Sequence, residues 1–591
     1  MIKDLSPVSF RTQMSEVSRE LAPTREELSD NARVVLNRRY QAKDSNGQVT
    51  ETVVEMFRRV ASTLAEAELK YRKDETNRAT IEEGFFNMMS RLDFLPNSPT
   101  IMNAGRRLGQ LSACFVLPIE DDLDSIFSRV HDAAMIHKSG GGTGFSFSRL
   151  RPTGDVVGST GGIASGPVSF IRAFDTATDV VKQGGTRRGA NMAIIDVTHP
   201  DIMEFIHSKQ DKVNLSNFNI SVGVTEDFMA KVENDEYYNL INPRDGKHVG
   251  TVHAPYVFEQ ITQMAWETGD PGLIFLDRIN DDNPNPHLGP IESTNPCGEQ
   301  PLQPYESCNL GSVNLANMLK YTDDGCVVNW EKLAYTVSMG VRLLDNVVDC
   351  NNYPLPEIAD MSRRTRRIGL GVMGLADMMI QLGIQYDSES AITFTDFVMS
   401  FVHREAHKAS RALATARGSY PAWEGSIYEV TMRNSAPTTV APTGTISIIA
   451  GASSGIEPLF ALSYMRNVMD GTKLVEMNPY FEKVAKKEGF YSLELLKQIH
   501  ETGTLEGTDV PDWVKSVFRT SHDISPEWHI RLQAAAQKHT DNSVSKTINF
   551  PSTATVEDVA EAYMLAYTLG CKGITVYRDG SKDEQVLSVG T

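Results

Sequence analysis

The residues most able to do chemistry lie in one short stretch, ESTNPCGEQPLQPYESCNL, at 292–310. Asn295, Cys297 and Glu299 occupy alternate positions there, and Cys308 follows. Two prolines disfavour a regular helix, and in an extended segment side chains two apart share one face. The sequence therefore predicts an extended loop that presents an amide, a thiol and a carboxylate together to one small molecule.

Three kinds of thiol chemistry can be compared with this pattern. A cysteine protease or acyltransferase needs a histidine base beside its thiol, and no histidine is nearby in sequence, although the fold could bring one from elsewhere. A structural zinc site favours Cys-x-x-Cys spacings, which the sequence lacks. One thiol beside a carboxylate, with a separate thiol pair that can close into a disulfide, suits a radical reduction. A buried cysteine with solvated polar neighbours is the ordinary alternative.

The composition is that of a large folded protein. The 591 residues include 57 Lys and Arg against 76 Asp and Glu, a net charge of −19, which disfavours a general nucleic-acid or anionic-membrane binder. No apolar run approaches about eighteen residues, and the start, MIKDLSPVSF, lacks the pattern of a signal peptide. Six cysteines in so long a chain do not make a disulfide framework. We therefore expect a cytoplasmic protein with reduced thiols and neither nucleic-acid nor membrane partners.

The chain divides into two regions that differ in their sequence pattern. Residues 1–85 have a polar, helical pattern, with the clearest amphipathic helix at 51–71. Over 86–591, glycine-rich loops alternate with helices and short apolar strands, which predicts one large α/β domain. Within it, Pro167 is placed to begin a helix and Gly184 to end it.

A strand–helix–strand unit is predicted near the C-terminal end. KTINF (546–550) and GITVY (573–577) are typical of strands, and the helix between them begins with a capping box of Thr555 and Asp558.

Two apparent motifs have simpler structural explanations. GLGVMG (369–374) has the glycine spacing of a dinucleotide-binding turn, but such a turn follows a buried strand, and here it follows RRTRR. We expect a structural glycine turn. HREAH spaces His403 and His407 as in zinc sites, yet its glutamate is misplaced for the protease motif and no further Cys or His is close in sequence. We expect solvated histidines on a helix, and no metal ligand from protein side chains.

As a set, the motifs resemble those of ribonucleotide reductase large subunits. NPCGE and the following ESCNLGSVNL are similar to that family's active site. The resemblance covers roughly residues 30–582 in consistent order. It includes NSPTIMNAGRRLGQLSACFVLPIEDDLDSIF at the first barrel strand, KQGGTRRGA at the substrate-selecting loop and APTGTISIIAG at the substrate-phosphate loop.

The resemblance implies a fold and a set of catalytic roles. The fold would be a ten-stranded α/β barrel of two five-stranded halves with a central active-site finger loop, preceded by a mostly helical N-terminal region. Cys297 would carry a thiyl radical and abstract the ribose 3′-hydrogen, Glu299 would be the general base for the 3′-hydroxyl, and Asn295 would hold the ribose. Cys114 and Cys308 would reduce C2′ and become a disulfide. Ribonucleotides, with diphosphates expected, would become 2′-deoxyribonucleotides for DNA precursor synthesis.

The resemblance also implies three binding regions. Hydroxyls and a glycine that allows close backbone approach make the phosphate loop a plausible anion site, although such a turn alone is commonly just a turn. The expected substrate-binding residues are Ser98, Ala113, Gly142, Pro442, Thr443, Gly444, Thr445, Ile446 and Ser447. The expected specificity loop comprises Gln183, Gly184, Gly185, Thr186, Arg187 and Arg188. A deoxynucleoside triphosphate effector would bind Asp121, Lys138 and Arg151, which could otherwise be ordinary surface charges, in a homodimer formed near 122–137 and 167–182.

Members of the family differ in how the radical is made. Those with a metal-bearing second subunit carry adjacent tyrosines near the end of the barrel, where CKGITVYRDGS here has Val576 and Tyr577 only. Glycyl-radical members lack the active-site glutamate, which is present as Glu299. The segment KGITVYRDGS resembles the corresponding sequence of the adenosylcobalamin-dependent members of the family. The sequence has no D-x-H-x-x-G motif, so we expect no histidine ligand to cobalt.

Two questions about function stay open at this point. Relatives generally carry a C-terminal cysteine pair, whereas Cys571 is the last cysteine before Thr591; either such a tail has been removed, or an external thioredoxin, glutaredoxin or small dithiol reduces the active site directly. The N-terminal stretch does not resemble the regulatory ATP-binding cone of many relatives.

Two other functions compete with catalysis of ribonucleotide reduction. They are a non-catalytic nucleotide-binding regulator and a thiol hydrolase that uses Cys297.

Overall fold

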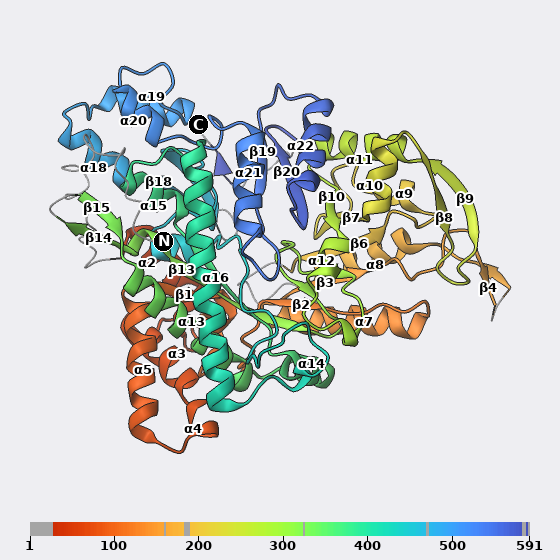
Figure 1. The fold of residues 1–591 in the computed structure, drawn as a ribbon, viewed down its shortest axis with the longest axis horizontal. Helices are drawn as coiled ribbons and strands as arrows, with labels where there is room; N and C mark the ends of the chain where they lie inside the picture. The colour runs from red at the N-terminus through yellow and green to blue at the C-terminus, as the bar shows by residue number, and fades with distance from the viewer. Residues whose placement is uncertain are drawn as a thin grey trace.

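The structure of the protein is a computed structural model. It describes residues 28–158, 161–181, 189–322, 325–468, 472–581 and 587–588. Its centre is a ten-stranded sheet surrounded by helices (Figure 1). Within the described part of the chain, none of the helices combines the length and apolar character that a bilayer crossing requires.

The first half of the sheet consists of five strands that all run parallel. Each pairs with the next in space, and helices fill the connections between most of them. They are β2 (Cys114–Val116), β3 (Gly142–Ser146), β6 (Asn191–Asp196), β7 (Phe218–Val224) and β10 (Gly272–Phe275).

The second half closes the barrel. β13 (Ser307–Asn314) pairs in parallel with β16 (Ile368–Met373), and β19 (Thr547–Phe550) pairs in parallel with β20 (Gly573–Arg578). Two short parallel bridges, Leu370 with Thr438 and Val440 with Val544, join these pairs. The halves meet antiparallel, at β13–β2 and at β10–β20. β1 (Phe94–Pro96), antiparallel to β13, is the tenth strand of the sheet, and the predicted ten-stranded α/β barrel is confirmed.

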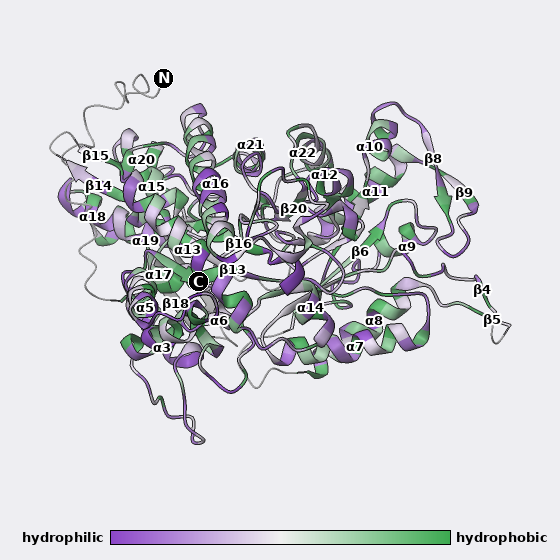
Figure 2. Ribbon diagram, turned by 60° about the horizontal axis from the view of Figure 1, so that its bottom comes forward, coloured by the Kyte–Doolittle hydropathy of each residue, from purple (hydrophilic) through white to green (hydrophobic). Residues whose placement is uncertain are grey.

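Helices cover the outside of the barrel and present mixed hydropathy, with green and purple alternating along α7, α8 and α16 (Figure 2). This pattern is typical of helices that bury one stripe against a sheet. The elements that matter for the site are α2 (Asp30–Val35), α3 (Val53–Ala65), α4 (Glu68–Tyr71), α5 (Glu75–Ser90), β1 (Phe94–Pro96), α6 (Ser98–Asn103), α7 (Leu123–Lys138), α8 (Pro167–Val180), β11 (Ser293–Thr294), β12 (Pro301–Leu302), β15 (Gly325–Val328), α13 (Trp330–Cys350), α16 (Glu389–Arg417), α17 (Ile446–Ala450), α19 (Leu493–Thr502), α21 (Pro526–Gln537) and α22 (Val556–Thr568).

Several local predictions are confirmed. Pro167 is the first residue of α8, whereas the predicted stop at Gly184 lies outside the described residues. The Thr555–Asp558 capping box opens α22 between β19 and β20. The amphipathic helix expected at 51–71 is split into α3 and α4.

The expectation of a glycine turn at 369–374 was wrong, because residues 368–373 form the buried strand β16. A Cβ at Gly371 would lie 2.5 Å from the Thr439 carbonyl oxygen, and one at Gly369 would lie 2.4 Å from Leu310. The glycines therefore serve close packing between strands, and the dinucleotide interpretation stays unsupported.

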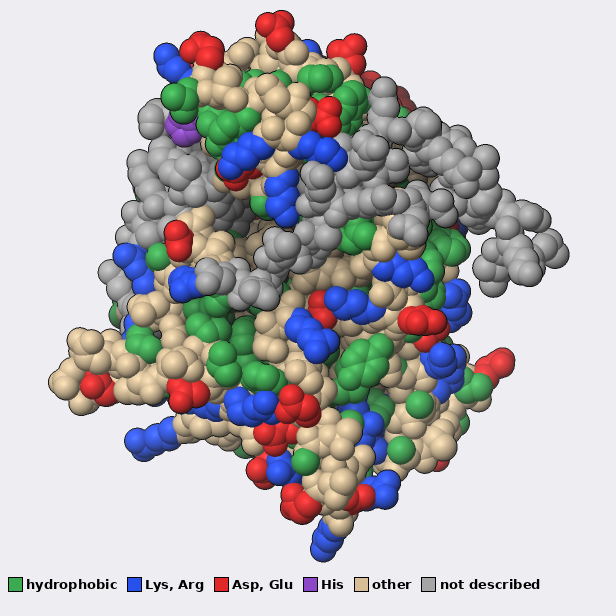
Figure 3. Space-filling view, turned by 90° about the vertical axis from the view of Figure 1, so that its left-hand side faces the viewer, with side chains coloured by type: hydrophobic (Ala, Val, Ile, Leu, Met, Phe, Trp, Pro, Cys, Tyr) green, Lys and Arg blue, Asp and Glu red, His purple; other side chains and the backbone are tan. Residues whose placement is uncertain are grey.

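The N-terminal helices share a core with the second half of the barrel. One apolar cluster includes Phe57 of α3, Phe85 of α5, Val341 of α13 and Leu370 of β16. Buried charges add to this junction, where Glu68 of α4 receives hydrogen bonds from Arg342 and Arg417. On the outer face drawn in Figure 3, basic and acidic side chains are interspersed. The boundary at residue 85 stays a prediction.

Candidate active site

The segment around Cys297 is the tip of a hairpin. β11 and β12 pair antiparallel, and the chain turns between them, where the Gly298 amide donates to the Asn295 carbonyl at 3.0 Å. Gly298 has φ +80°, which suits glycine because it lacks a Cβ. The predicted extended loop is therefore wrong in its backbone, because the turn interrupts the alternation of faces.

This hairpin, which we call the finger, lies inside the barrel and is held by both halves. From the first half, the Asn219 amide donates to the Pro296 carbonyl at 2.8 Å. A Cβ at Gly144 would lie 1.7 Å from the Thr294 carbonyl oxygen, so the finger packs directly on the backbone of β3. From the second half, the Thr439 hydroxyl and the Ser543 amide donate to the Glu299 carbonyl at 2.9 and 3.0 Å.

Two of the three predicted finger side chains meet Cys114. The Asn295 side-chain amide donates to Sγ of Cys114 at 3.1 Å, and its oxygen accepts from the Gln300 amide at 3.0 Å. Oε1 of Glu299 lies 4.0 Å from Sγ of Cys114. Asn295 and Glu299 are both 2% exposed, whereas Cys297 is exposed. The structure thus separates one accessible thiol from a buried amide–carboxylate–thiol group.

Cys297 faces a large cavity of about 1130 Å³. β7, β10 and β20 contribute to its wall through Asn219, Ser221, Ile274 and Gly573–Tyr577. The expected phosphate loop contributes Pro442, Gly444 and Ser447. One cavity therefore joins the accessible thiol to a polar loop and to the strand that carries Val576 and Tyr577.

Cys114 and Cys308 lie opposite each other on neighbouring strands. They are Cα partners across the antiparallel β2–β13 pair, and such partners have Cβ atoms about 4.5–5.5 Å apart. Burial strongly raises the pKa of the Cys308 thiol, so it is protonated at neutral pH. None of the six cysteines, all of which lie in the described part of the chain, forms a disulfide in this structure.

The expected phosphate loop is a turn that leads into α17. Thr443 has φ +54°, and its hydroxyl accepts from the Gly455 amide at 2.8 Å. Gly444 is exposed, and a Cβ at this position would have no heavy atom of the described residues within 4 Å, apart from its chain neighbours. Thr445 directly precedes α17 without a capping hydrogen bond from its side chain, Ile446 is the buried first residue of the helix, and neither contributes to the cavity wall.

The other three expected substrate residues sit on the barrel without lining this cavity. The Ser98 hydroxyl is 2.7 Å from the Tyr40 hydroxyl. The Ala113 amide donates to the Cys308 carbonyl at 3.0 Å, and the Gly142 amide donates to the Ala113 carbonyl at 2.8 Å. A Cβ at Gly142 would lie 2.8 Å from Pro296, so this glycine accommodates the finger.

Within one chain, only two of the three expected effector residues lie close together. Arg151 and Asp121 form an ion pair of 2.8 Å. Lys138 is the exposed last residue of α7. That helix has 16 residues, a length of about 24 Å, so its whole length separates Lys138 from that ion pair. The specificity loop, residues 183–188, lies outside the described residues.

Sequence patterns missed several residues that hold the site. Asn219 and Thr439 bind the finger backbone, and the asparagine near the start of the largely apolar strand 218–224 was the available signal for the first. Behind Cys308, Arg367 donates to Glu306 at 2.9 Å in a fully buried pair. Nothing in the local sequence predicts that pairing, because the partners are far apart in the chain.

Comparison with known proteins agrees with this geometry. The family model described as the ribonucleotide reductase barrel domain matches residues 112–431 and 427–577, and the all-alpha domain of the same family matches residues 26–109. A Thermoplasma acidophilum protein named vitamin B12-dependent ribonucleoside-diphosphate reductase is 52% identical, over 95% of this chain and 80% of its own length. A Mycobacterium tuberculosis protein of the same name is 48% identical, over 98% of this chain and 84% of its own length.

A solved structure is similar to this chain over nearly the whole length of both proteins. The Actinobacillus ureae class Id ribonucleotide reductase alpha subunit superposes with a TM-score of 0.77, at 26% identity, over 94% of this chain and 98% of that one. The names of the relatives support the catalytic interpretation rather than the non-catalytic regulator. Family models, relatives and the finger geometry agree, and the chain belongs to the ribonucleotide reductase family.

Proposed function

We propose that this protein reduces ribonucleoside diphosphates to 2′-deoxyribonucleotides by a thiyl-radical mechanism that depends on adenosylcobalamin. The observation that carries the proposal is the separation of thiols: Cys297 is exposed on the cavity, whereas Cys114 and Cys308 are buried cross-strand partners behind it. The diphosphate preference and the cofactor follow the names of the relatives.

The cavity fits a large cofactor beside Cys297. Its volume of about 1130 Å³ exceeds the range of about 300–1,000 Å³ usual for small-molecule sites. The Tyr577 hydroxyl is buried without a hydrogen-bond partner among the described residues, and Tyr577 lines this wall. We assign the cofactor to the wall of Asn219, Ser221, Ile274 and 573–577. The chemistry that bound adenosylcobalamin supplies is homolysis of its cobalt–carbon bond, a local source of a radical.

The finger side chains act on the ribose. Cys297, as a thiyl radical, abstracts the 3′-hydrogen, and Glu299 accepts the proton of the 3′-hydroxyl as general base. Asn295 orients the sugar, and its own amide is fixed by the Gln300 backbone and Cys114. The radical requires a dry pocket; Asn295 and Glu299 are 2% exposed, whereas Cys297 is open to the cavity that substrate and cofactor would fill.

Cys114 and Cys308 supply the two electrons. The C2′–OH bond breaks and the oxygen leaves as water, a hydrogen replaces it on C2′, and the two thiols become one disulfide. Cys297 then returns the abstracted hydrogen to C3′. The raised pKa of Cys308 keeps its hydrogen on sulfur until it is needed. A thioredoxin- or glutaredoxin-type protein or a small dithiol then reduces the disulfide.

The substrate phosphates bind at the loop Pro442–Ser447. Gly444 is open, so backbone amides there can approach an anion closely. Ser447 lines the same cavity as Cys297. Ser98, Ala113 and Gly142 stay predicted substrate residues of the neighbouring barrel wall.

The working form is a homodimer that binds a deoxynucleoside triphosphate effector. Three apolar residues on α7 are exposed: Leu123 (62%), Phe127 (54%) and Met135 (40%). They recur on one face of the helix, which suits a helix–helix interface. A second chain packed on α7 and α8 could bring its Lys138 to the Asp121–Arg151 pair. The loop 183–188 would carry the effector signal to the substrate.

The test is anaerobic reduction of nucleoside diphosphates with a dithiol and no second subunit. We expect deoxynucleotide formation with adenosylcobalamin and none without it. Cys297→Ser should abolish formation, while Cys326→Ser on β15 should not. Activity without cobalamin, restored by a metal-containing partner subunit, would overturn the cofactor assignment.

The proposed dimer is tested by sedimentation. Phe127→Glu should shift the sedimentation coefficient toward that of a monomer, whereas Leu493→Glu on α19, at 85% exposure, should not.

A further inference from the structure

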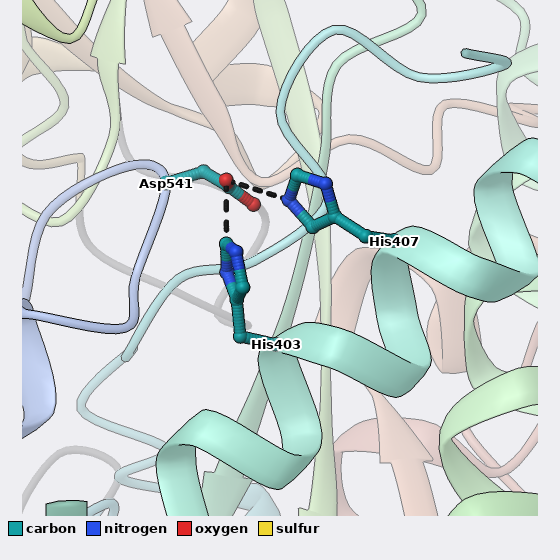
Figure 4. Close-up of side chains that lie close together, drawn as sticks. All are labelled: His403, His407 and Asp541. Atoms are coloured by element: carbon teal, nitrogen blue, oxygen red, sulfur yellow. Dashed lines mark hydrogen bonds and ion pairs between the residues drawn. The ribbon is translucent and has the colours of Figure 1, made fainter. Parts of the chain in front are cut away.

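Far from the finger side chains in sequence, two histidines and an aspartate converge outside the proposed ribonucleotide and effector sites. His403 and His407 lie one turn apart on α16, and Asp541 lies in the loop between α21 and β19. Both rings point toward the Asp541 carboxylate (Figure 4). The expectation of solvated histidines was therefore wrong, because the fold supplies a partner that is 134 residues away from His407.

The three ligand atoms are close enough to share one ion. Nε2 of His407 lies 2.8 Å and Nδ1 of His403 lies 3.8 Å from Oδ1 of Asp541. The candidate ligand atoms of all three residues lie within 4.8 Å of one another. Ligands at zinc–nitrogen distances in a tetrahedral site are about 3.3 Å apart, so small side-chain adjustments would complete the coordination.

The carboxylate is already oriented for this role. Oδ2 of Asp541 accepts from the Thr438 amide at 2.9 Å and from the Thr438 hydroxyl at 2.8 Å. Oδ1 is thereby directed at the histidines, as outer hydrogen bonds commonly direct metal ligands. Nδ1 of His403 is buried and, among the residues that the structure describes, has no hydrogen-bond partner.

We propose that His403, His407 and Asp541 bind one zinc-type divalent transition-metal ion. Imidazole and carboxylate ligands suit zinc and its neighbours, whereas Mg²⁺ and Ca²⁺ favour all-oxygen sites. The three residues line a cavity of about 420 Å³, which leaves room for water as a fourth ligand. Two lysines that line this cavity are already paired, Lys538 with Asp396 at 2.8 Å and Lys572 with Asp282 at 2.9 Å.

The ion would fasten α16 to the segments that hold the finger. Thr438 precedes Thr439, which binds the Glu299 carbonyl, and Asp541 stands two residues before Ser543, which binds the same carbonyl. The role is structural, because the cluster reaches Glu299 only through backbone and neighbouring side chains. Metal binding is measured directly, so this inference can fail while the proposed reductase activity stands.

The experiment uses Co²⁺ as a spectroscopic probe on chelator-treated, anaerobic full-length protein. We expect one Co²⁺ per chain at this site. Its spectrum should show visible ligand-field bands and should lack the near-ultraviolet band that thiolate ligands produce. Zn²⁺ should displace it and raise the melting temperature. His407→Ala and Asp541→Asn should each weaken binding by at least about tenfold, a loss typical of ligand-shell changes.

Two further variants keep the test decisive. His253→Ala is the matched control, because His253 also pairs with an aspartate, Asp235, at 2.9 Å, and it should leave Co²⁺ binding unchanged. His403→Asn changes a partly exposed residue, so this variant should fold. It should weaken Co²⁺ binding, and it keeps the test valid if Asp541→Asn does not fold. Absence of Co²⁺ binding, binding through thiolates alone, or binding unaffected by His403→Asn and His407→Ala would overturn the proposal.

Discussion

Cys114 on β2 and Cys308 on β13 are direct partners across an antiparallel strand pair. Disulfides require Cα atoms about 4.4–6.8 Å apart, a range that such partners satisfy. The pair can therefore close without rearranging the barrel. Cys297 stands apart from it at the tip of the finger, so the radical and the two-electron chemistry are assigned to different sulfurs.

The first prediction concerns these sulfurs. Cys114→Ser and Cys308→Ser should each block normal deoxynucleotide formation while still allowing attack on the substrate, detected as release of free base. Cys297→Ser should abolish both, because no thiyl radical can form. The assay is chromatography of nucleotides and bases after anaerobic turnover with a small dithiol. Full deoxynucleotide production by Cys114→Ser would end the assignment.

The second concerns the base. Glu299→Gln keeps the shape of the side chain but removes its ability to accept a proton. We expect kcat to fall by about 10²–10⁴, the usual contribution of general acid–base catalysis, with little change in the affinity for effector. A residual rate within a factor of about two of the parent protein would remove Glu299 from the mechanism.

The third concerns finger packing. Gly144→Ala would put a Cβ 1.7 Å from the Thr294 carbonyl oxygen, so the finger must shift. Displacements of about 1 Å can cost about 10² in rate, and we expect a loss of that order in kcat/KM with the circular dichroism spectrum retained. Gly158→Ala is the control, since no heavy atom of the described residues, apart from its chain neighbours, lies within 4 Å of a Cβ at this position. Equal activity of the two variants would contradict the described packing.

The fourth concerns stability at low pH. Hydrogen bonds and charges from Arg342 and Arg417 outweigh burial and lower the pKa of Glu68 to about 2, below the ordinary value of 4.5. A depressed carboxyl pKa stabilises the fold above the ordinary pKa of 4.5, and this stability is lost as pH falls toward 2.

Glu68→Gln should therefore lower the urea midpoint at pH 7 and flatten its fall between pH 5 and 2. Glu83→Gln is the control: Arg58 also lowers the pKa of Glu83, but the pair is exposed, so both quantities should change much less than in Glu68→Gln. An unaltered pH profile for Glu68→Gln would show that this carboxylate is not a source of acid sensitivity.

Local signals predicted much of the fold. The Thr555–Asp558 capping box and Pro167 marked helix starts because hydrogen bonding and proline geometry act within a few residues. β16 was missed because its glycines are required by contacts with Thr439 and Leu310. Those contacts depend on strands distant in sequence and leave no local pattern.

The site was predictable in composition but not in geometry. Alternation at Asn295, Cys297 and Glu299 indicated shared chemistry, although the turn at Gly298 replaces the extended loop. The partnership of His407 with Asp541 could not be inferred, since only the folded barrel brings α16 to that loop. Likewise, Lys138 is sequentially close to Arg151 but the length of α7 separates it from the ion pair.

The most direct test of the thiol assignment is a single anaerobic turnover without external reductant. Reduced protein is mixed with adenosylcobalamin, effector and a nucleoside diphosphate, then quenched in acid with a thiol-blocking reagent and mapped by mass spectrometry. We predict one deoxynucleotide for each Cys114–Cys308 disulfide formed, with Cys297 recovered as a blocked thiol. Deoxynucleotide formed while Cys114 and Cys308 remain reduced, or a disulfide that involves Cys297, would contradict the assignment.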